Sequence, residues 1–282
     1  MTASPSSAAQ AARERLAARL RDVRREAGLS GAELALRCGW SPSKRSRIEN
    51  ARTSPSDADV RDWCAACDAE DQAADLVAAN RQADQTYVHW KKLHRHGMRR
   101  AQEEMLPLYA RTRRFRVYCS NVVPGVLQTE AYATALLSTI ARFQGTPDDA
   151  PEAAASRIER SRVLHEGDHR FAFLLEETVL RYRIGPPEAM ASQLGYLLAV
   201  MALPNVSLGV IPADAERRMW PLEAFYIFDD HRVSSELLTA AVNVMAPGEI
   251  ATYARAFAEM SESAVYGARA RALITDAIHA LG

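Results

Sequence analysis

Two short helices joined by a glycine turn, between residues 30 and 50, constrain the fold of this chain more than any other feature. Ser30 is followed by Glu33, which is the capping-box pattern at the start of a helix. Gly39 supplies a sharp turn after this helix, and Ser41 caps the next one. The spacing predicts a helix-turn-helix, in which one helix braces the DNA backbone while the next enters the major groove.

The second helix of this motif, expected over residues 42–50, carries short hydrogen-bond donors and long cations. Such side chains suit contacts with base edges and phosphates. The residues that we expect to bind DNA are Ser41, Ser43, Lys44, Ser46, Arg47, Asn50 and Arg52. The alternative is a plain helical bundle with a solvated basic face.

Apolar residues at helical spacing predict further helices around the motif. The first is expected to end at Gly28, Ser56 caps a fourth, and a fifth is expected to end near Asn80. The residues expected inside this bundle are Leu16, Leu20, Val23, Leu34, Ala35, Ile48, Val60, Trp63, Cys64, Cys67, Leu76 and Val77.

The pattern changes after about residue 86, where alternating apolar residues predict strands. Strands are expected at 115–119, 171–175, 206–211, 225–228 and 232–237, and helices at 129–141, 157–166, 185–203 and 249–281. Because strands and helices do not alternate strictly, we expect an α+β fold overall. An all-α helix-turn-helix bundle is expected to precede a C-terminal α+β domain with a small, mostly antiparallel sheet. The expected divisions are a disordered tail at 1–12, the helix-turn-helix domain at 13–86, and a domain for sensing, partner binding and dimerisation at 87–282.

Charge is distributed in blocks, although the chain has 35 basic and 35 acidic residues in total. Residues 13–52 hold 11 basic and 5 acidic residues, whereas residues 53–86 hold 2 and 8. The first block therefore does not repel nucleic acid. No apolar run approaches the roughly 20 residues that span a bilayer, and four cysteines do not make a disulfide framework. These observations predict a cytoplasmic protein that does not enter the membrane.

Three further groups of residues give weaker signals for a functional site, and each has two interpretations. Cys64 and Cys67 have the spacing of a metal or redox pair, but their apolar surroundings favour buried thiols. Glu176, Glu177 and Glu236 form a candidate carboxylate pair for hydrolysis, against which we favour pairing with Arg181, Arg183 or Arg157. Arg157, Arg160 and Arg162 either grip an anionic ligand or form a solvated face. We expect no cofactor and no metal, and we expect that the chain is not an enzyme.

Residues 26–56, EAGLSGAELALRCGWSPSKRSRIENARTSPS, resemble the XRE-type helix-turn-helix regulators. Later stretches resemble the domain of unknown function attached to this motif in many actinobacterial regulators, which are described as antitoxin-like. The stretches are VVPGVLQTEAYATALL (122–137), RIERSRVL (157–164), LEETVLRYRIG (175–185), QLGYLLAVMALPNVSLGVIP (193–212) and FYIFDD through SSELL (225–238). The resemblance implies a sequence-specific transcriptional regulator that binds double-stranded DNA. It also implies a small partner protein encoded by an adjacent gene.

Three positions depart from the family pattern. Arg45 stands where the family has an inward apolar residue, and Pro42 and Gly31 stand where many relatives of the wider class have glutamine. Those amides commonly contact DNA, so their absence affects the target sequence. If Arg45 is buried under strain, Arg45→Val should stabilise the bundle, and if it reaches DNA, the same change should weaken binding.

One short helix-turn-helix makes few base contacts, and specificity usually requires two copies on half-sites about 34–36 Å apart. We therefore expect a homodimer held mainly by residues after about 87. The alternatives to a regulator are an antitoxin-like protein that neutralises a small partner and, less favoured, a hydrolase that uses the C-terminal carboxylates.

Overall fold

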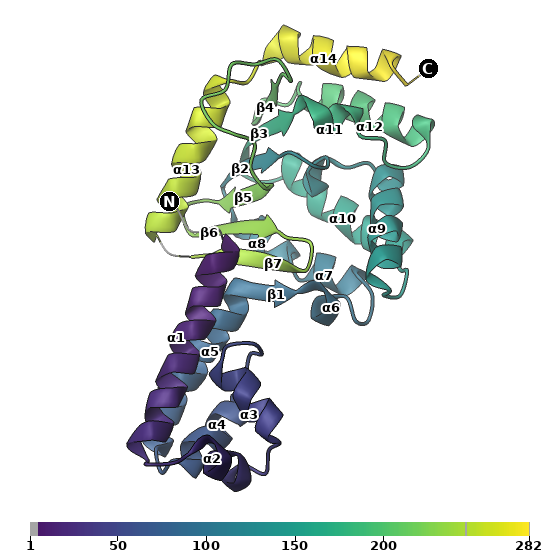
Figure 1. Ribbon diagram of the computed structural model, residues 1–282. Coiled ribbons are helices and arrows are strands. Elements are labelled where there is room, and N and C mark those ends of the chain that lie inside the picture. Colours follow the sequence, from purple (N-terminus) through teal and green to yellow (C-terminus); the bar gives the residue numbers. More distant parts are fainter. Residues whose placement is uncertain (1–4, 246, 282) are drawn as a thin grey trace. The chain divides into compact units, whose positions relative to one another are not determined.

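The chain divides into two compact units, one ending at Val88 and the other beginning at His89. A computed structural model of the protein describes residues 5–245 and 247–281. The first unit consists of α1 (Pro5–Glu26), α2 (Gly31–Arg37), α3 (Pro42–Glu49), α4 (Asp57–Ala66), a short 3-10 turn (Glu70–Gln72) and α5 (Ala73–Thr86). Within this unit α1 and α5 run side by side (Figure 1).

The cap residues of the first unit behave as predicted. Ser30, Ser41 and Ser56 each accept a hydrogen bond from a backbone N–H in the first turn of the helix that follows. Every residue that we expected inside the bundle is buried. The indole N–H of Trp63 donates to the carbonyl of Leu20 at 2.9 Å, which ties α4 to α1 at the centre of this core.

Two helix boundaries in the first unit differ from the prediction. Residues 5–12, which we expected in a disordered tail, belong to α1. Their alanines have high helix propensity, and Pro5 fits the first helical position. The fifth helix continues past Asn80 to Thr86, because no glycine or proline interrupts it. The Asn80 side chain is buried and donates to the carbonyl of Pro55 at 3.0 Å.

The second unit is built on a seven-stranded sheet with the order β1-β7-β6-β5-β2-β3-β4. The strands are β1 (Tyr87–His89), β2 (Arg114–Cys119), β3 (Arg170–Glu176), β4 (Val206–Ile211), β5 (Phe225–Phe228), β6 (Arg232–Glu236) and β7 (Ala240–Val244). Strands β2, β3 and β4 pair in parallel, and the pairs β2–β5, β5–β6 and β6–β7 are antiparallel. The predicted α+β fold, with a helical first domain and a mostly antiparallel sheet, is confirmed.

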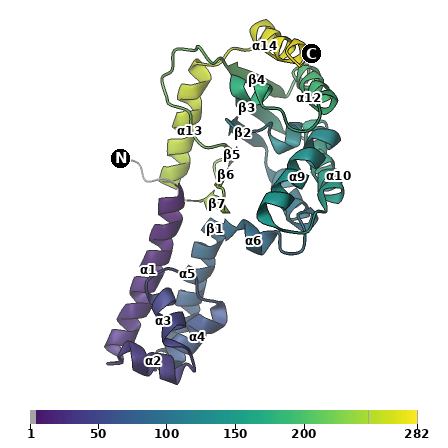
Figure 2. The same ribbon diagram turned by 45° about the vertical axis from the view of Figure 1, so that its right-hand side comes forward.

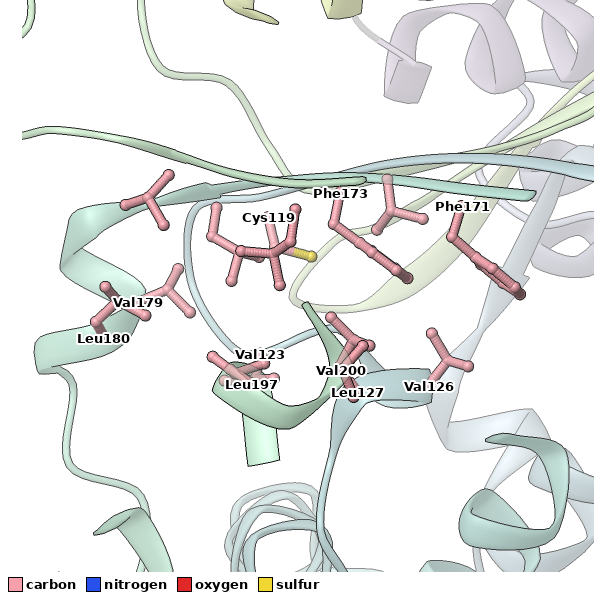
Figure 3. Close-up of a cluster of buried hydrophobic side chains, with 14 of the residues drawn as sticks. Cys119, Val123, Val126, Leu127, Phe171, Phe173, Val179, Leu180, Leu197 and Val200 are labelled. Atoms are coloured by element: carbon pink, nitrogen blue, oxygen red, sulfur yellow. The ribbon is translucent and has the colours of Figure 1, made fainter. Parts of the chain in front are cut away.

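Helices cover both faces of this sheet. Figures 1 and 2 show α9 (Glu130–Gln144), α10 (Ala150–Ser161) and α12 (Pro187–Val200) on one side and α13 (Pro247–Glu262) on the other. The remaining helices are α6 (Trp90–Leu93), α7 (Arg99–Glu103), α8 (Leu106–Arg111), α11 (Glu177–Arg181) and α14 (Gly267–His279), with 3-10 turns at Gly125–Leu127 and Arg162–Leu164. On the first face, Phe171 and Phe173 of β3 point toward Leu197 and Val200 of α12 (Figure 3). This cluster is the main core of the unit.

Several elements of the second unit differ from the prediction. The helix expected over 157–166 is α10, which begins earlier at Ala150 and ends at Ser161, and the short elements β1, α6, α7, α8 and α11 were not predicted. Strand β7, with the sequence AAVNV, was missed because it lacks a clear alternation of apolar and polar residues. The helix expected over residues 249–281 is two helices, α13 and α14. They are separated where Val265 forms a two-way backbone bridge with Val210 of β4, at 2.8 and 3.0 Å. None of the described helices is long and apolar enough to cross a membrane.

Candidate nucleic-acid interface

The turn between α2 and α3 has the sharp geometry that the glycine predicts. Gly39 has a φ of +66°, a left-handed conformation that glycine adopts without steric cost. The next residue, Trp40, donates its backbone N–H to the carbonyl of Ala35 at 2.8 Å, which closes the end of α2. The Trp40 ring lies 6.2 Å from that of Trp63, and this contact attaches the turn to the bundle core.

One face of α3 is turned to solvent. Ser43, Arg47 and Asn50 recur at spacings of four and three residues, so they lie on the same side of the helix, and all three are accessible to solvent. Ser46 lies on this side as well and is half-buried. Ile48, on the opposite side, is buried in the bundle core as predicted. The helix therefore presents a row of short polar side chains around one arginine.

Arg47 and Arg52 form no ion pair with any residue in the described part of the chain, and both are exposed. The backbone N–H of Arg52 donates to the carbonyl of Arg47 at 2.8 Å, so the two cations follow one another around the end of α3. Asn50 donates to the carbonyl of Ser46 at 2.8 Å and to the Ser46 hydroxyl at 3.3 Å. Among the seven expected DNA-binding residues, Asn50 and Ser46 thus hold each other in place. Arg47 and Arg52 are cations without an ion pair to any described residue.

Lys44 has a different environment from these arginines. Its Nζ lies 2.6 Å from Oδ1 of Asp59 on α4 and 4.3 Å from the centre of the Trp40 ring. Burial raises the pKa of Asp59, but hydrogen bonds from Lys44 and Ser56 outweigh this effect and lower the pKa below its ordinary value. The ammonium group of Lys44 is therefore already engaged inside the first unit, whereas the Ser41 hydroxyl caps α3.

Arg45 neither faces solvent nor lies unpaired in the core. Its Nη1 bonds Oε2 of Glu49 at 2.5 Å, and the guanidinium of Arg24 binds Oε1 of the same carboxylate at 2.6 and 3.0 Å. Glu49 is 5% exposed. Burial raises its pKa, but the two arginines together lower it below the ordinary value. Arg45 is therefore neither buried without a partner nor directed outward, which were the two interpretations drawn from the sequence. It belongs to a half-buried network of two arginines around one carboxylate.

The family model for a domain of unknown function, DUF5753, matches residues 102–276, which is more than half of the chain. The chain belongs to the DUF5753 family. A model for a helix-turn-helix domain matches residues 15–77, so the DUF5753 domain follows a helix-turn-helix domain, and this match supports DNA binding by the first unit. A comparison with curated proteins finds no match.

One solved structure is similar to this DUF5753 protein over 85% of this chain and 88% of its own. It is TrmBL2, described as an archaeal chromatin protein whose structure shows a novel mode of DNA binding. The two chains share 11% identity with a TM-score of 0.32.

Two of the three carboxylates considered for hydrolysis in the DUF5753 domain, Glu176 and Glu177, are engaged in ion pairs, whereas Glu236 is exposed and forms no ion pair with a described residue. Both oxygens of Glu176 accept from Arg217, at 2.8 and 2.6 Å, and the hydroxyl of Tyr118 donates to Oε1 at 2.9 Å. Glu177 pairs with Arg181 at 3.1 Å. The pairing of Glu177 was predicted, whereas Arg217, which lies in a loop, carried no sequence signal for its role.

Two arginines of α10 in the DUF5753 domain lie beside the PGVLQT segment (124–129), where Arg160 is buried and Arg157 is half-buried. The interpretation of a solvated face is therefore wrong for Arg160, whereas Arg162 is exposed. Nε of Arg157 and Nη1 of Arg160 both donate to Oε1 of Gln102 at 3.1 Å, and Arg157 also donates to Gln128 at 2.6 Å. Neither forms an ion pair with a described residue. Burial and the neighbouring Arg160 lower the pKa of Arg157 to about 10. A Cβ at Gly125 would lie 3.1 Å from Nη2 of Arg160, a closer approach than most Cβ atoms make.

The cysteine pair is structural, as the apolar surroundings indicated. Cys64 and Cys67 are buried, unbridged and part of the bundle core. Burial, the largest cause, raises the pKa of the Cys67 thiol to about 11, so it is protonated at neutral pH. Within the described residues, no group of histidine, cysteine, aspartate and glutamate has the geometry of a metal site.

Proposed function

We propose that this protein is a sequence-specific transcriptional regulator that binds double-stranded DNA with α3 and the segment after it. The observation that carries the proposal is the solvent-facing row of Ser43, Arg47 and Asn50, which continues into Arg52. Arginine reads base edges with two parallel hydrogen bonds and also binds phosphates, and asparagine and serine supply neutral donors and acceptors.

The local charges support DNA as the partner of this row. Arg47 and Arg52 form no ion pair in the described part of the chain, so no internal acid has to release them when they contact phosphate. The acidic Asp59 of α4 is used inside the unit: one oxygen holds Lys44, and the other accepts from the backbone N–H of Ser56. The resemblance of residues 26–56 to XRE-type regulators agrees with this assignment.

The regulator acts as a homodimer in this proposal. Two copies of α3 on half-sites about 34–36 Å apart supply the base contacts that one short helix lacks. The second unit is the larger of the two and the better source of the interface, because the fourth and fifth helices of the first unit are acidic. The second unit also acts as the sensor that couples an external signal to DNA binding.

The chain does not act as an enzyme in this proposal. Glu176 is held by Arg217 and Tyr118, and Glu177 is held by Arg181, so these carboxylates serve as internal counter-charges. An antitoxin-like role toward a small partner protein rests on the family resemblance alone. We therefore keep it as a secondary role that acts through the second unit.

Selection of bound duplexes from a random library, followed by footprinting on the upstream region of the protein's own gene, tests the proposal. We expect an enriched pseudo-palindrome whose half-sites repeat about one helical turn apart, and protection of the same element in the upstream region. Enrichment of no sequence, or binding to all duplexes with equal affinity, would refute sequence-specific regulation.

A further inference from the structure

A cavity of about 710 Å³ lies in the second unit, where β2 and β3 begin and where the β5–β6 hairpin turns. These strands can be followed in Figure 1. The volume is within the range of about 300–1,000 Å³ that is usual for small-molecule sites. Five arginines line it: Arg111, Arg113, Arg114, Arg170 and Arg232. Arg114 and Arg170 are paired positions of neighbouring strands, where two like charges repel each other.

Three acidic residues line the cavity, Asp168, Asp229 and Asp230, and they neutralise the five arginines only in part. Asp168 is exposed and forms no ion pair with a described residue. Asp230 is shared between Arg114, at 2.5 Å, and Arg116, at 2.8 Å. The carboxylate of Asp229 accepts the backbone N–H groups of residues 113 and 114, at 3.1 and 2.8 Å, so it fixes the loop and not a guanidinium. Arg111, Arg113 and Arg170 form no ion pair with any residue that the structure describes.

Arg232 is held in place by neutral groups. Its guanidinium donates to Oδ1 of Asn243 at 2.6 and 3.1 Å and to the Ser234 hydroxyl at 3.0 Å. Burial lowers the pKa of Arg232, and so does the nearby charge of Arg111. A half-buried cation loses part of its hydration, and here the neighbouring charge is a second cation, Arg111, and not an acid.

Part of the cavity wall is apolar, and Thr112, Asp168 and His231 complete the lining. Leu108 of α8 and Phe228 of β5 are buried, and Met245 is 50% exposed although it is a large apolar residue. Methionine and phenylalanine provide an adaptable apolar surface against which a ring packs well. The cavity therefore combines a cationic side with an apolar side.

We propose that this cavity binds a small organic anion, a molecule with one phosphate or carboxylate group and an apolar or aromatic body. Arg111 and Arg232 bind the anionic group, and Phe228 and Met245 contact the body. The proposal deepens the sensor role given above and rests on that role for its regulatory meaning. The binding itself is measured without DNA.

Isothermal titration of the full chain at low ionic strength tests the site with four probes: phenyl phosphate, benzoate, inorganic phosphate and the neutral benzamide. We expect saturable binding of phenyl phosphate or benzoate with one molecule per chain, and the tighter of the two identifies the preferred anionic group. Inorganic phosphate should bind at least about tenfold more weakly because it lacks the body, and benzamide should give no saturable signal.

Arg111→Gln is the decisive variant, because Arg111 is exposed and forms no ion pair among the described residues, so its replacement should not disturb folding. It should weaken the preferred probe by about tenfold or more. Arg271→Gln, a matched change of an exposed arginine on α14 outside the cavity, should leave the affinity unchanged. Circular dichroism and a thermal melt check that both variants are folded.

Two results would overturn the site: no saturable binding of phenyl phosphate or benzoate up to about 10 mM, or unchanged affinity in Arg111→Gln. A DNA titration of Arg111→Gln without probe keeps this test separate from the proposed function, since the variant should bind DNA like the unmodified protein. If neither protein binds DNA, the regulator proposal fails while the titration still decides the cavity.

Discussion

The guanidinium of Arg45 occupies the space that a side chain at position 31 would need. A Cβ on Gly31 would lie 2.5 Å from Cζ of Arg45 and 2.7 Å from each of its terminal nitrogens. The two departures from the family pattern at positions 31 and 45 therefore depend on each other. The small residue at the start of α2 admits the large cation of α3, and Glu49 then fixes that cation in place.

We predict that the effect of Gly31→Ala on the free energy of unfolding depends on the residue at position 45 and has opposite signs with arginine and with valine there. With Arg45 present, the new methyl group displaces the guanidinium from Glu49 and lowers the free energy of unfolding by about 1–3 kcal/mol. With Arg45→Val, the same substitution is neutral or stabilising by up to about 1 kcal/mol, because alanine favours the helix. Urea unfolding of the four proteins measures the cycle. Equal effects of Gly31→Ala in both backgrounds would disprove the steric link, and Gly195→Ala, with open space around it, is the control.

Glu49→Gln should be the most destabilising conservative change in the first unit. It leaves Arg24 and Arg45 without their shared counter-charge, and breaking a buried ion pair in this way costs about 3–5 kcal/mol. Glu26→Gln, a matched change of an exposed residue in α1, should have almost no effect. Denaturant titrations of both variants make the comparison, and similar midpoints for the two would show that the network does not stabilise the bundle.

The same carboxylate predicts a pH dependence. The folded pKa of Glu49 is below the ordinary value of 4.5, since the arginines outweigh burial, so its stabilising effect is fully present above about pH 4.5. The effect disappears as the pH falls through the folded pKa. The free energy of unfolding should therefore change less between about pH 7 and about pH 3 in Glu49→Gln than in the unmodified protein. If the two proteins lose the same stability at low pH, groups other than Glu49 cause the acid sensitivity.

Gln102→Glu should stabilise the second unit near neutral pH. The substitution is nearly isosteric and places a carboxylate where Arg157 and Arg160 now share one amide oxygen. Hydrogen bonds to charged groups contribute about 1.5–3 kcal/mol, more than neutral ones. Gln102→Leu removes the acceptor and should destabilise the unit by about 1–3 kcal/mol. Thermal melts compare the two variants, and a lower melting temperature for Gln102→Glu would contradict the role of this position as the shared acceptor of Arg157 and Arg160.

The homodimer has its own test. Light scattering at micromolar concentration should give a dimer for the full chain and for residues 87–282, and a monomer for residues 1–86. The acidic surface of the fourth and fifth helices disfavours self-association of the shorter fragment. A dimeric 1–86 fragment with a monomeric 87–282 fragment would move the interface to the first unit.

The fold of the first unit was largely predictable because its signals are local. Serine caps, the glycine turn and apolar spacing each act within one or two helical turns, and the structure has these features where they were expected. The partner of Lys44 and the position of Arg45 beside Gly31 were not predictable in the same way, although Glu49 lies four residues after Arg45 in the same helix. Asp59 lies on another helix, and the space beside Gly31 exists only once α2 and α3 pack together.

The second unit shows the same limit over longer distances. Strand β4 was predicted with its observed bounds from its apolar residues alone, whereas β7 depends on pairing with β6. The arginine-lined cavity joins residues from α8, β3, the β5–β6 turn and the end of β7, which no spacing in the sequence connects. The periodicity of a sequence shows which residues share a face of one helix or strand, but not which residues of different strands a sheet brings together.

Arg47 and Arg52 contact DNA in the regulator that we propose, and the salt dependence of binding tests this contact most directly. Affinity for the selected duplex is measured over a range of salt concentrations for the unmodified protein, for Arg47→Ala/Arg52→Ala and for the control Arg25→Ala, whose exposed side chain lies on the face of α1 away from the core. Removing one phosphate contact should lower the slope of log affinity against log salt by roughly 1, and removing one base contact should cost about 1–3 kcal/mol at a single position. We predict a weaker and less salt-dependent double variant beside an unchanged control. A double variant that binds with the affinity and salt slope of the unmodified protein would contradict the account.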